Sequence, residues 1–505
     1  MDSAGLDKIK IPALEVREVG LTRDVRYGIA RVGGLPSCAY GQLVQFSGGT
    51  KGMVMGFNAV DVLVIILGEE NSVSVGDSVS SLSELITVPV GAGFLGRIVN
   101  CLAEPLDGKG DISCADFYPV FREALGVIER EPIVEPMLTG TKIIDLMLPI
   151  GKGQRELVIG DRQTGKSTIC VDAILNQKDK DVVCIYCWVG GPQAALKNII
   201  HTLAQHKALE YTIIVSAPAD TSAAEQYLTP YTAATLGEYF MFNGKHALVV
   251  FDDLTKHAWM YRQMSLLLER APGREAYPGD IFYVHSQLLE RAGKLKQSRG
   301  GGSMTFLPIA ETLQGDITGY IQTNLISITD GQIYLSSVLF REGFKPAIDI
   351  GLSISRIGSK VQSSAIKEVS VGLRLEYARY RQMLRLTKLR TRLSSEAIGQ
   401  MRRGDTLREL LVQPSNVPFS AEEQVVLFYA FKRKILENLP LQALRRFSEH
   451  FFKYLVANEP GFIQKLQEAK DLSIDVKVEL DKIIVKFFRG MRDVEIKDQL
   501  PEEKG

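Results

Sequence analysis

The stretch GDRQTGKST, at residues 160–168, is the part of the chain whose residue types and spacing best suit chemistry. It fits the pattern G-x-x-x-x-G-K-[ST], in which glycines let backbone amides turn toward phosphates and a following helix adds its positive dipole end. The apolar run ELVIG precedes it and the helix-like run STICVDAILNQ follows. The sequence therefore predicts a phosphate-binding loop made of Gly160, Asp161, Arg162, Gln163, Thr164, Gly165, Lys166, Ser167 and Thr168.

Two further features predict that the loop holds Mg²⁺ together with ATP or ADP. In loops of this type the lysine, here Lys166, reaches the β- and γ-phosphates, and the hydroxyl of the next residue, Ser167, binds magnesium. The magnesium shell also needs a carboxylate, and HALVVFDDL supplies Asp252 at the end of an apolar run. We expect Asp252 to act on the metal through water.

Hydrolysis of the bound nucleotide needs a group that orients or polarises the attacking water, commonly a carboxylate at the end of an adjacent strand. After the apolar run VVCIYCWVG the sequence reads GPQAALKN, and no Asp or Glu lies between Asp181 and Glu210. The pattern therefore favours a site that holds a nucleotide over one that hydrolyses it.

The elements that must position this site divide the 505-residue chain into parts, because the chain is too long for a single core. Short apolar runs with glycine turns predict an N-terminal β-barrel over 1–86. Strand-like runs alternating with helical ones predict a mostly parallel α/β domain of P-loop type over 87–362. Apolar residues at helical spacing predict a C-terminal α-helical domain over 363–505. We expect the polar segments RRGDTL and QPSNVP to be loops between its helices.

Composition, charge and cysteine spacing limit the classes of function that the chain can have. Lys plus Arg and Asp plus Glu both number 59, so the formal charge is zero and gives no support to nucleic-acid binding. No apolar run reaches the ~18–20 residues of a membrane span, so we expect the chain to be soluble and to meet a membrane only through partners. Cys184 and Cys187 read as C-x-x-C, but without a second ligand pair they fit a buried strand better than zinc or redox chemistry.

Beyond the phosphate loop, the block 252–358, with ISITDGQIYLSSVLF and KPAIDIGLSISRIGSKVQ, resembles the α subunits of F-type ATP synthases. The resemblance extends from about residue 13 to beyond residue 430. It implies a central RecA-like fold and an α3β3 ring in which α alternates with a catalytic β subunit around a central shaft. It implies further that α holds Mg-ATP without hydrolysing it, lends an arginine to the site on β, and touches a peripheral stalk.

Carried over by position, the resemblance assigns Arg356 in LSISRIGS as that arginine finger and Ser327 in LISITDG as a polar residue near the same interface. Fingers of this kind raise rates by ~10³–10⁵ in other systems. It also places Lys345, Pro346 and Gln413 around the adenine.

The sequence departs from the family in ways that bear on function. Gly191, followed by Pro192, stands where β has its catalytic glutamate and α a glutamine. Lys345 replaces an arginine, and Pro414 and Ser415 interrupt a Gln-x-Gln pattern. An acidic loop of α that faces the shaft is here RLTKLRTRLS, with Arg392 and Ser394 in place of two aspartates. Around it, 374–403 carries nine basic side chains against two acidic ones, which favours either a solvated helix face or an acidic partner. The basic residues are Arg374, Arg379, Arg381, Arg385, Lys388, Arg390, Arg392, Arg402 and Arg403.

The resemblance places the chain on the periphery of an energy-transducing membrane, at its cytoplasmic or equivalent face, within a complex that makes ATP. Two alternatives remain at this point. One is an α-like subunit of a rotary ATPase repurposed for work other than ATP synthesis. The other is a Rho-like hexameric nucleic-acid translocase, which is disfavoured because Tyr40, Phe46 and Phe57 are not interleaved with a basic cluster.

Overall fold

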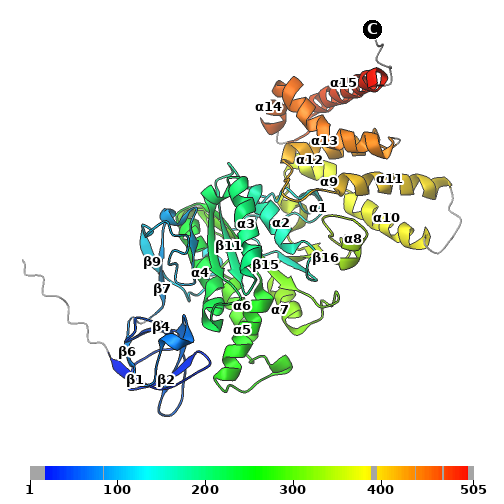
Figure 1. Cartoon of the computed structure of the whole chain (residues 1–505). Helices are drawn as coiled ribbons and strands as arrows, with labels where there is room; N and C mark the ends of the chain where they lie inside the picture. The colour runs from blue at the N-terminus through cyan, green and yellow to red at the C-terminus, as the bar shows by residue number, and fades with distance from the viewer. Residues whose placement is uncertain (1–17, 83–84, 388–394, 438, 469–470, 499–505) are drawn as a thin grey trace, which may run out of the picture.

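Three parts follow one another along the chain (Figure 1). The computed structural model describes residues 18–82, 85–387, 395–437, 439–468 and 471–498. A closed barrel comes first, a parallel sheet flanked by helices lies in the centre, and a group of helices lies at the opposite end from the barrel. This order confirms the predicted fold class.

The N-terminal part is a six-stranded barrel in which the strands are paired in the order β1-β2-β5-β4-β3-β6. Its strands are β1 (Val19–Arg26), β2 (Ile29–Gly33), β3 (Leu43–Phe46), β4 (Lys51–Phe57), β5 (Val62–Leu67) and β6 (Ser78–Ser81). Phe46 is buried inside, whereas Tyr40 and Phe57 are about half exposed. The barrel is fastened to the central part by Arg270, whose Nη2 donates to the carbonyl of Met55, and by an Arg31–Glu269 ion pair.

The central sheet runs β17-β16-β10-β15-β13-β11-β12-β8, with β14 beside β15. Its inner strands are parallel, as the near-continuous apolar runs predicted. The strands are β8 (Ile98–Val99), β10 (Leu157–Gly160), β11 (Val182–Val189), β12 (Thr212–Ala217), β13 (His246–Asp252), β14 (Gly293–Lys294), β15 (Ser303–Glu311), β16 (Gly331–Leu335) and β17 (Ile354–Ser355). A separate ribbon pairs β7 (Thr87–Val90) with β9 (Asp116–Pro119).

Helices cover both faces of this sheet. Successive side chains of β11 point to opposite faces, and their contacts show which helices lie on which face. Cys184, Tyr186 and Trp188 pack in one cluster with α2 and α3, while Val183, Ile185 and Cys187 pack in another with α4, α5 and α6. The two cysteines are fully buried on opposite faces, so the C-x-x-C is part of a core strand. The helices of this part are α1 (Lys142–Met147), α2 (Lys166–Leu175), α3 (Gln193–Gln205), α4 (Ala223–Phe242), α5 (Leu254–Leu267), α6 (Ile281–Leu289), α7 (Tyr320–Ile328) and α8 (Ser337–Arg341).

The last part is helical in the described residues and shares a continuous apolar core with α1 and α2. Its helices are α9 (Ser364–Ser370), α10 (Leu373–Thr387), α11 (Ser395–Leu411), α12 (Ala421–Lys432), α13 (Leu441–Asn458), α14 (Pro460–Glu468) and α15 (Ile474–Asp498). The expectation that RRGDTL forms a loop is wrong, because residues 402–407 lie inside α11. Gly404 there permits close packing, since a Cβ would lie 2.1 Å from Cδ2 of Tyr380 on α10. QPSNVP is a loop, as expected.

Some basic residues of segment 374–403 bind other residues of the same chain. Arg374 donates to the carbonyls of Ile350 and Ser353, and Arg403 bonds Glu376 and Glu437. By contrast, Arg379, Arg385 and Arg402 are exposed on α10 and α11. Lys388, Arg390, Arg392 and Ser394 lie outside the described residues.

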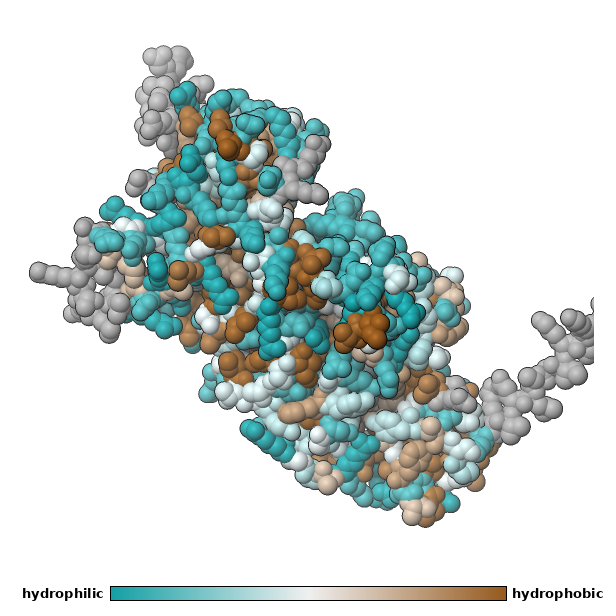
Figure 2. Space-filling model, turned by 180° about the vertical axis from the view of Figure 1, so that it is seen from behind, coloured by the Kyte–Doolittle hydropathy of each residue, from teal (hydrophilic) through white to brown (hydrophobic). Residues whose placement is uncertain are grey.

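The face shown in Figure 2 carries hydrophilic side chains over most of its area, with apolar ones in separate clusters. Within the described ranges, no helix combines the length and apolar character needed to cross a bilayer.

Candidate functional site

The phosphate loop lies at the carboxyl end of β10, where the backbone turns into α2. Gly165, just before the helix, has a φ of 97°, which favours glycine, and Gln163 has a φ of 61°. The ammonium of Lys166 donates to the carbonyls of Gly160 (2.9 Å) and Asp161 (2.7 Å), so the loop itself positions it. Burial lowers the pKa of Lys166. The side chain and the amides at the start of α2 converge where phosphates bind in loops of this type.

Asp161 closes this loop against the next one. Its Oδ1 accepts hydrogen bonds from the hydroxyl of Thr312 (2.6 Å) and the amide of Gly315 (2.7 Å). Burial acts to raise the pKa of Asp161, but these bonds bring it below the usual value, so the carboxylate stays ionised. Asp161 thus has a structural role that the loop pattern alone did not specify.

Ser167 and Asp252 lie together, as a magnesium site requires. The Ser167 hydroxyl donates to Asp252 Oδ2 at 2.5 Å, and the same oxygen accepts from the phenol of Tyr186 at 2.6 Å. Asp252 ends β13 and is 5% exposed. Burial and the neighbouring Asp252 charge raise the pKa of Tyr186 far above its usual value, so its phenol stays a donor. A hydroxyl and a carboxylate at a phosphate loop are the oxygen donors that Mg²⁺ prefers, so these residues fit the metal.

The indole of Trp188, near the end of β11, packs against Gly191. A Cβ on Gly191 would lie 2.1 Å from Cζ2 of Trp188, and the indole Nε1 donates to the carbonyl of Gly191 at 3.3 Å. Only glycine fits at 191 beside this ring. Nothing in the sequence pattern connected Trp188 with Gly191, because their contact depends on how the backbone turns after β11.

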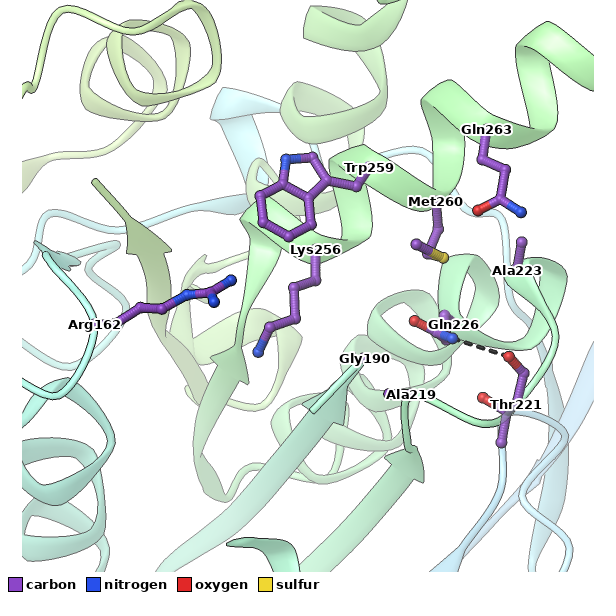
Figure 3. Close-up of a pocket in the computed structure, with 10 residues that line it drawn as sticks. All are labelled: Arg162, Gly190, Ala219, Thr221, Ala223, Gln226, Lys256, Trp259, Met260 and Gln263. Atoms are coloured by element: carbon purple, nitrogen blue, oxygen red, sulfur yellow. Dashed lines mark hydrogen bonds between the residues drawn. The ribbon is translucent and has the colours of Figure 1, made fainter. Parts of the chain in front are cut away.

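Two ion pairs at the same edge of the sheet were missed by sequence reasoning (Figure 3 shows their cations). Arg162 Nε donates to Glu311 Oε2 at 2.9 Å, and Lys256 Nζ lies 3.1 Å from Asp253 Oδ2. Glu311 ends β15, so a carboxylate does lie near the phosphate loop, although not on the strand where one was sought. Glu311 is engaged in an ion pair with Arg162. Burial raises the pKa of Asp253 to about 6, against the opposing effect of Lys256.

The three residues expected at the adenine are brought together at the carboxyl end of β16. The amide of Gln413 donates to the carbonyl of Lys345 at 2.9 Å. Pro346 follows Lys345, whose ammonium lies over the Phe340 ring. The side chain of Gln413 is 5% exposed and is bonded to Lys142, Gly140 and Val417. The geometry thus leaves the exposed Lys345 and the half-buried Pro346 as the accessible members of this group.

Arg356 lies at the other end of the sheet from the phosphate loop. Ser355 of β17 pairs with Gly331 at the start of β16, whereas Leu335 at its end pairs with Gly160. At about 3.3 Å per residue, these points are on the order of 13 Å apart along β16. Arg356 therefore cannot serve its own chain's phosphate site.

The guanidinium of Arg356 is exposed and free to meet a partner. In the part of the sequence that the structure describes, it has no carboxylate within salt-bridge distance, and its Nη2 bonds the carbonyl of Ile326 weakly, at 3.4 Å. The residue after Ile326, Ser327, is also exposed and bonds the carbonyl of Asn324 through its hydroxyl. The structure thus brings Arg356 and Ser327 to one surface.

Family models match three successive parts of the protein. They are the β-barrel domain of the ATP synthase alpha/beta family at residues 15–83, the nucleotide-binding domain of that family at 140–355, and its C-terminal domain at 362–487. The protein belongs to the ATP synthase alpha/beta family.

Two similar curated proteins are both named as α subunits of ATP synthases. ATP synthase subunit alpha of Petrotoga mobilis is 46% identical over 482 residues, which cover 95% of this chain and 96% of the relative. The subunit alpha of Clostridium acetobutylicum is 46% identical over 474 residues, 94% of each protein. The resemblance to α subunits of F-type ATP synthases is thereby confirmed, as is the expectation of an enzyme subunit that works within a complex.

Proposed function

We propose that this protein holds Mg-ATP or Mg-ADP at the phosphate loop and does not hydrolyse it. Lys166 and the amides of residues 160–168 would bind the phosphates, Ser167 would ligate Mg²⁺ directly, and Asp252 would act on it through water. Lys345, Pro346 and Gln413 would form the surroundings of the adenine. Bound Mg²⁺ would neutralise phosphate charge, while the hydroxyl and carboxylate of this protein fix its position.

The observation that carries the non-catalytic role is the Trp188–Gly191 contact. A side chain at 191 would meet the indole of Trp188, and Gly191 itself offers no carboxylate or amide that could bond an attacking water. The other nearby carboxylate, Glu311, is in an ion pair with Arg162. A nucleotide held here lacks the water-positioning group that γ-phosphate hydrolysis requires.

We propose further that Arg356, with Ser327 beside it, acts in the catalytic site of a neighbouring β-type subunit. Support comes from the exposure of its guanidinium and from its position at the far end of the sheet from its own phosphate loop. An arginine supplied in trans stabilises the charge that develops on the transferring phosphoryl group. The partners would be β-type subunits in an α3β3 ring, a central shaft and a peripheral stalk, with any membrane reached only through this complex.

The experiment is a comparison of binding with turnover on the purified full-length protein. Equilibrium dialysis with labelled Mg-ATP should show one tight site, and labelled phosphate should be released at no more than the rate of free ATP. A matched variant, Lys166→Gln, should lose the binding, which shows that it occurs at this loop. Sustained turnover by the lone protein that Lys166→Gln abolishes would overturn the proposal.

A second candidate, a motor of the same build that does not make ATP, is favoured by one observation. Arg379, Arg385 and Arg402 are exposed on helices where the family pattern leads to a shaft-facing loop. A basic surface there fits an acidic partner. Purification of the intact complex would distinguish the two functions. A proton-channel ring and stator among the copurified subunits would favour ATP synthesis. Other proteins in their place would favour the motor that does not make ATP.

A further inference from the structure

Glu156, the residue before β10, carries a carboxyl group that is fully buried in the central sheet. Its backbone amide donates to the carbonyl of Phe306 on β15 at 3.0 Å. One carboxyl oxygen, Oε2, accepts a hydrogen bond from Nε2 of Gln154 at 2.7 Å. The other, Oε1, is buried and has no hydrogen-bond partner among the described residues. The group lies at the opposite end of β10 from the phosphate loop, so the nucleotide site does not account for it.

The carboxyl group faces the pair of strands that leads to Arg356. A Cβ on Gly331, the first residue of β16, would lie 2.5 Å from Glu156 Oε2 and 2.8 Å from its Oε1. The same Cβ would lie 2.3 Å from the carbonyl oxygen of Ile354. Three oxygens therefore surround one point, and only glycine at 331 lets them approach it. Ile354 belongs to β17, a two-residue strand that pairs with β16 and runs directly into Arg356.

The surroundings of Glu156 favour its neutral form. Burial raises the pKa of Glu156 well above its usual value, and the negative charge of Asp330 raises it further. The hydrogen bond from Gln154 and the positive charge of Arg356 act in the opposite direction. The cation nearest to Asp330, Arg155, is engaged by that carboxylate through Nε (3.0 Å) and Nη2 (2.8 Å). β15, on the other side of Glu156, carries no ionisable side chain at this end.

A proton on Glu156 would resolve the crowding of oxygens above Gly331. A neutral carboxyl group has one O–H donor, whereas a carboxylate only accepts. With Oε2 accepting from Gln154, the proton belongs on Oε1, where it can donate toward the carbonyl of Ile354. An ionised group at the same place would repel that carbonyl without a cation in contact to offset it, which is strongly unfavourable in a buried position.

The backbone of Arg356 depends on the same strand pair. Its amide donates to the carbonyl of Asp330 at 2.9 Å, next to Gly331. Because β17 has only two residues, few contacts set the direction in which the chain leaves the sheet at Arg356. Loosening β17 would therefore displace the guanidinium without touching it.

We propose that Glu156 is a positioning residue for Arg356, and that its neutral form seats β17 against β16 and so aims the guanidinium at the neighbouring subunit's site. Ionisation of Glu156 removes the donor, repels the Ile354 carbonyl and loosens β17. The inference rests on the proposed function of Arg356. It adds a dependence on one proton, which that function alone does not require.

The first test uses the purified full-length protein and needs no partner. Infrared difference spectra at neutral pH should show that Glu156→Gln loses one protonated-carboxyl band. Glu135→Gln is the matched control and should lose none, because the hydrogen bond from Lys294 holds the pKa of Glu135 below its usual value. Hydrogen exchange over 354–358 should be faster in Glu156→Met, which keeps the length of the side chain without its hydrogen bonds. Glu156→Gln, a neutral side chain of the same shape, should exchange like the parent.

The second test measures ATP turnover by a ring assembled with the β-type partner. Glu156→Met should lower kcat about tenfold with KM unchanged, and Glu156→Gln should stay within about twofold of the parent. In a ring that already carries Arg356→Ala, Glu156→Met should cause no further loss, because the two residues act as a unit. The parent's turnover should also fall as the pH rises through the raised pKa of Glu156, and that of Glu156→Gln should not.

Two results would overturn the inference. One is an unchanged protonated-carboxyl band in Glu156→Gln, which would mean that Glu156 is ionised in the folded protein. The other is a ring in which Arg356→Ala abolishes turnover while Glu156→Met leaves it intact, or lowers it equally with and without Arg356. Failure of the proposed function would look different: turnover would survive Arg356→Ala, while the infrared and exchange results would still report the seating of β17 by Glu156.

Discussion

At the scale of single residues, the site depends on a few contacts between side chains far apart in the sequence. Ser167 and Asp252 share a hydrogen bond across 85 positions, and Trp188 occupies the space beside Gly191. The residue types at 160–168 and 252 could be predicted from sequence, because their spacing and their neighbouring strands belong to one chemistry. Tyr186, Trp188 and Glu311 could not, because their roles depend on which strands lie side by side.

Loss of the Ser167 hydroxyl should affect the metal more than the nucleotide. Ser167→Ala removes the group that would ligate Mg²⁺ and leaves Lys166 and the loop amides in place. We expect affinity for Mg-ATP to fall about tenfold, or about 1.4 kcal/mol, while affinity for ATP in EDTA is unchanged. Calorimetry measures both, and Ser167→Thr should restore the first. Equal losses with and without magnesium would contradict this role.

A side chain at 191 should conflict with Trp188. Gly191→Gln places atoms where the indole lies, and overpacking of this kind costs about 1–3 kcal/mol. Because the two residues touch, Trp188→Ala combined with Gly191→Gln should destabilise less than the sum of the single changes. Urea unfolding followed by circular dichroism measures this.

Gly279→Gln provides the control, since a Cβ there meets no atom within 4 Å. It should change the midpoint little. Additive effects of the two substitutions at 188 and 191 would show that the indole does not exclude a side chain at 191.

At the scale of elements, the spacing of apolar residues in the sequence predicted the order of strands and helices. It did not predict where one helix ends and the next loop begins. Apolar runs in the sequence indicated β10, β11 and β13, because a parallel sheet covered on both faces requires such runs. RRGDTL looked like a loop because it is polar and contains glycine. Gly404 instead lets α10 approach α11 closely, a requirement that exists only once the two helices pack.

The loop after α11 docks on α2 through a buried carboxylate. Asp172 Oδ1 accepts from the amide of Asn416 at 2.7 Å, and burial raises the pKa of Asp172 to about 6 from a usual value of 3.8. The folded state therefore binds this proton more tightly than the unfolded one. Its contribution to stability is present at low pH and is lost as the pH rises from about 4 to about 6.

Asp172→Asn should flatten this dependence. The amide oxygen can still accept from Asn416 but does not titrate, so the unfolding free energy at pH 7 should rise by up to about 3 kcal/mol relative to the parent. Urea midpoints at pH 4.5 and pH 7 measure the effect. If the gap between the two variants is no larger at pH 7 than at pH 4.5, the assigned pKa is wrong.

At the scale of the whole molecule, the two proposed functional surfaces lie at opposite ends of one sheet. The phosphate loop is at the carboxyl end of β10, and Arg356 follows β17 at the end where β16 begins. One molecule can thus hold a nucleotide and serve a different site on a neighbour at the same time. The family resemblance predicts this division of roles, and the register of β16 and β17 is compatible with it.

The most direct test is ATP turnover by a ring assembled from this protein and its β-type partner, with Arg356 intact or replaced by alanine. Removal of the guanidinium should lower multi-site hydrolysis by at least ~10³-fold, as for arginine fingers in other systems. The nucleotide content of this protein should stay unchanged, since Arg356 lies far from its loop. Turnover within a few-fold of the unmodified ring would contradict the account, because the chemistry would then proceed without the arginine that this protein is proposed to lend.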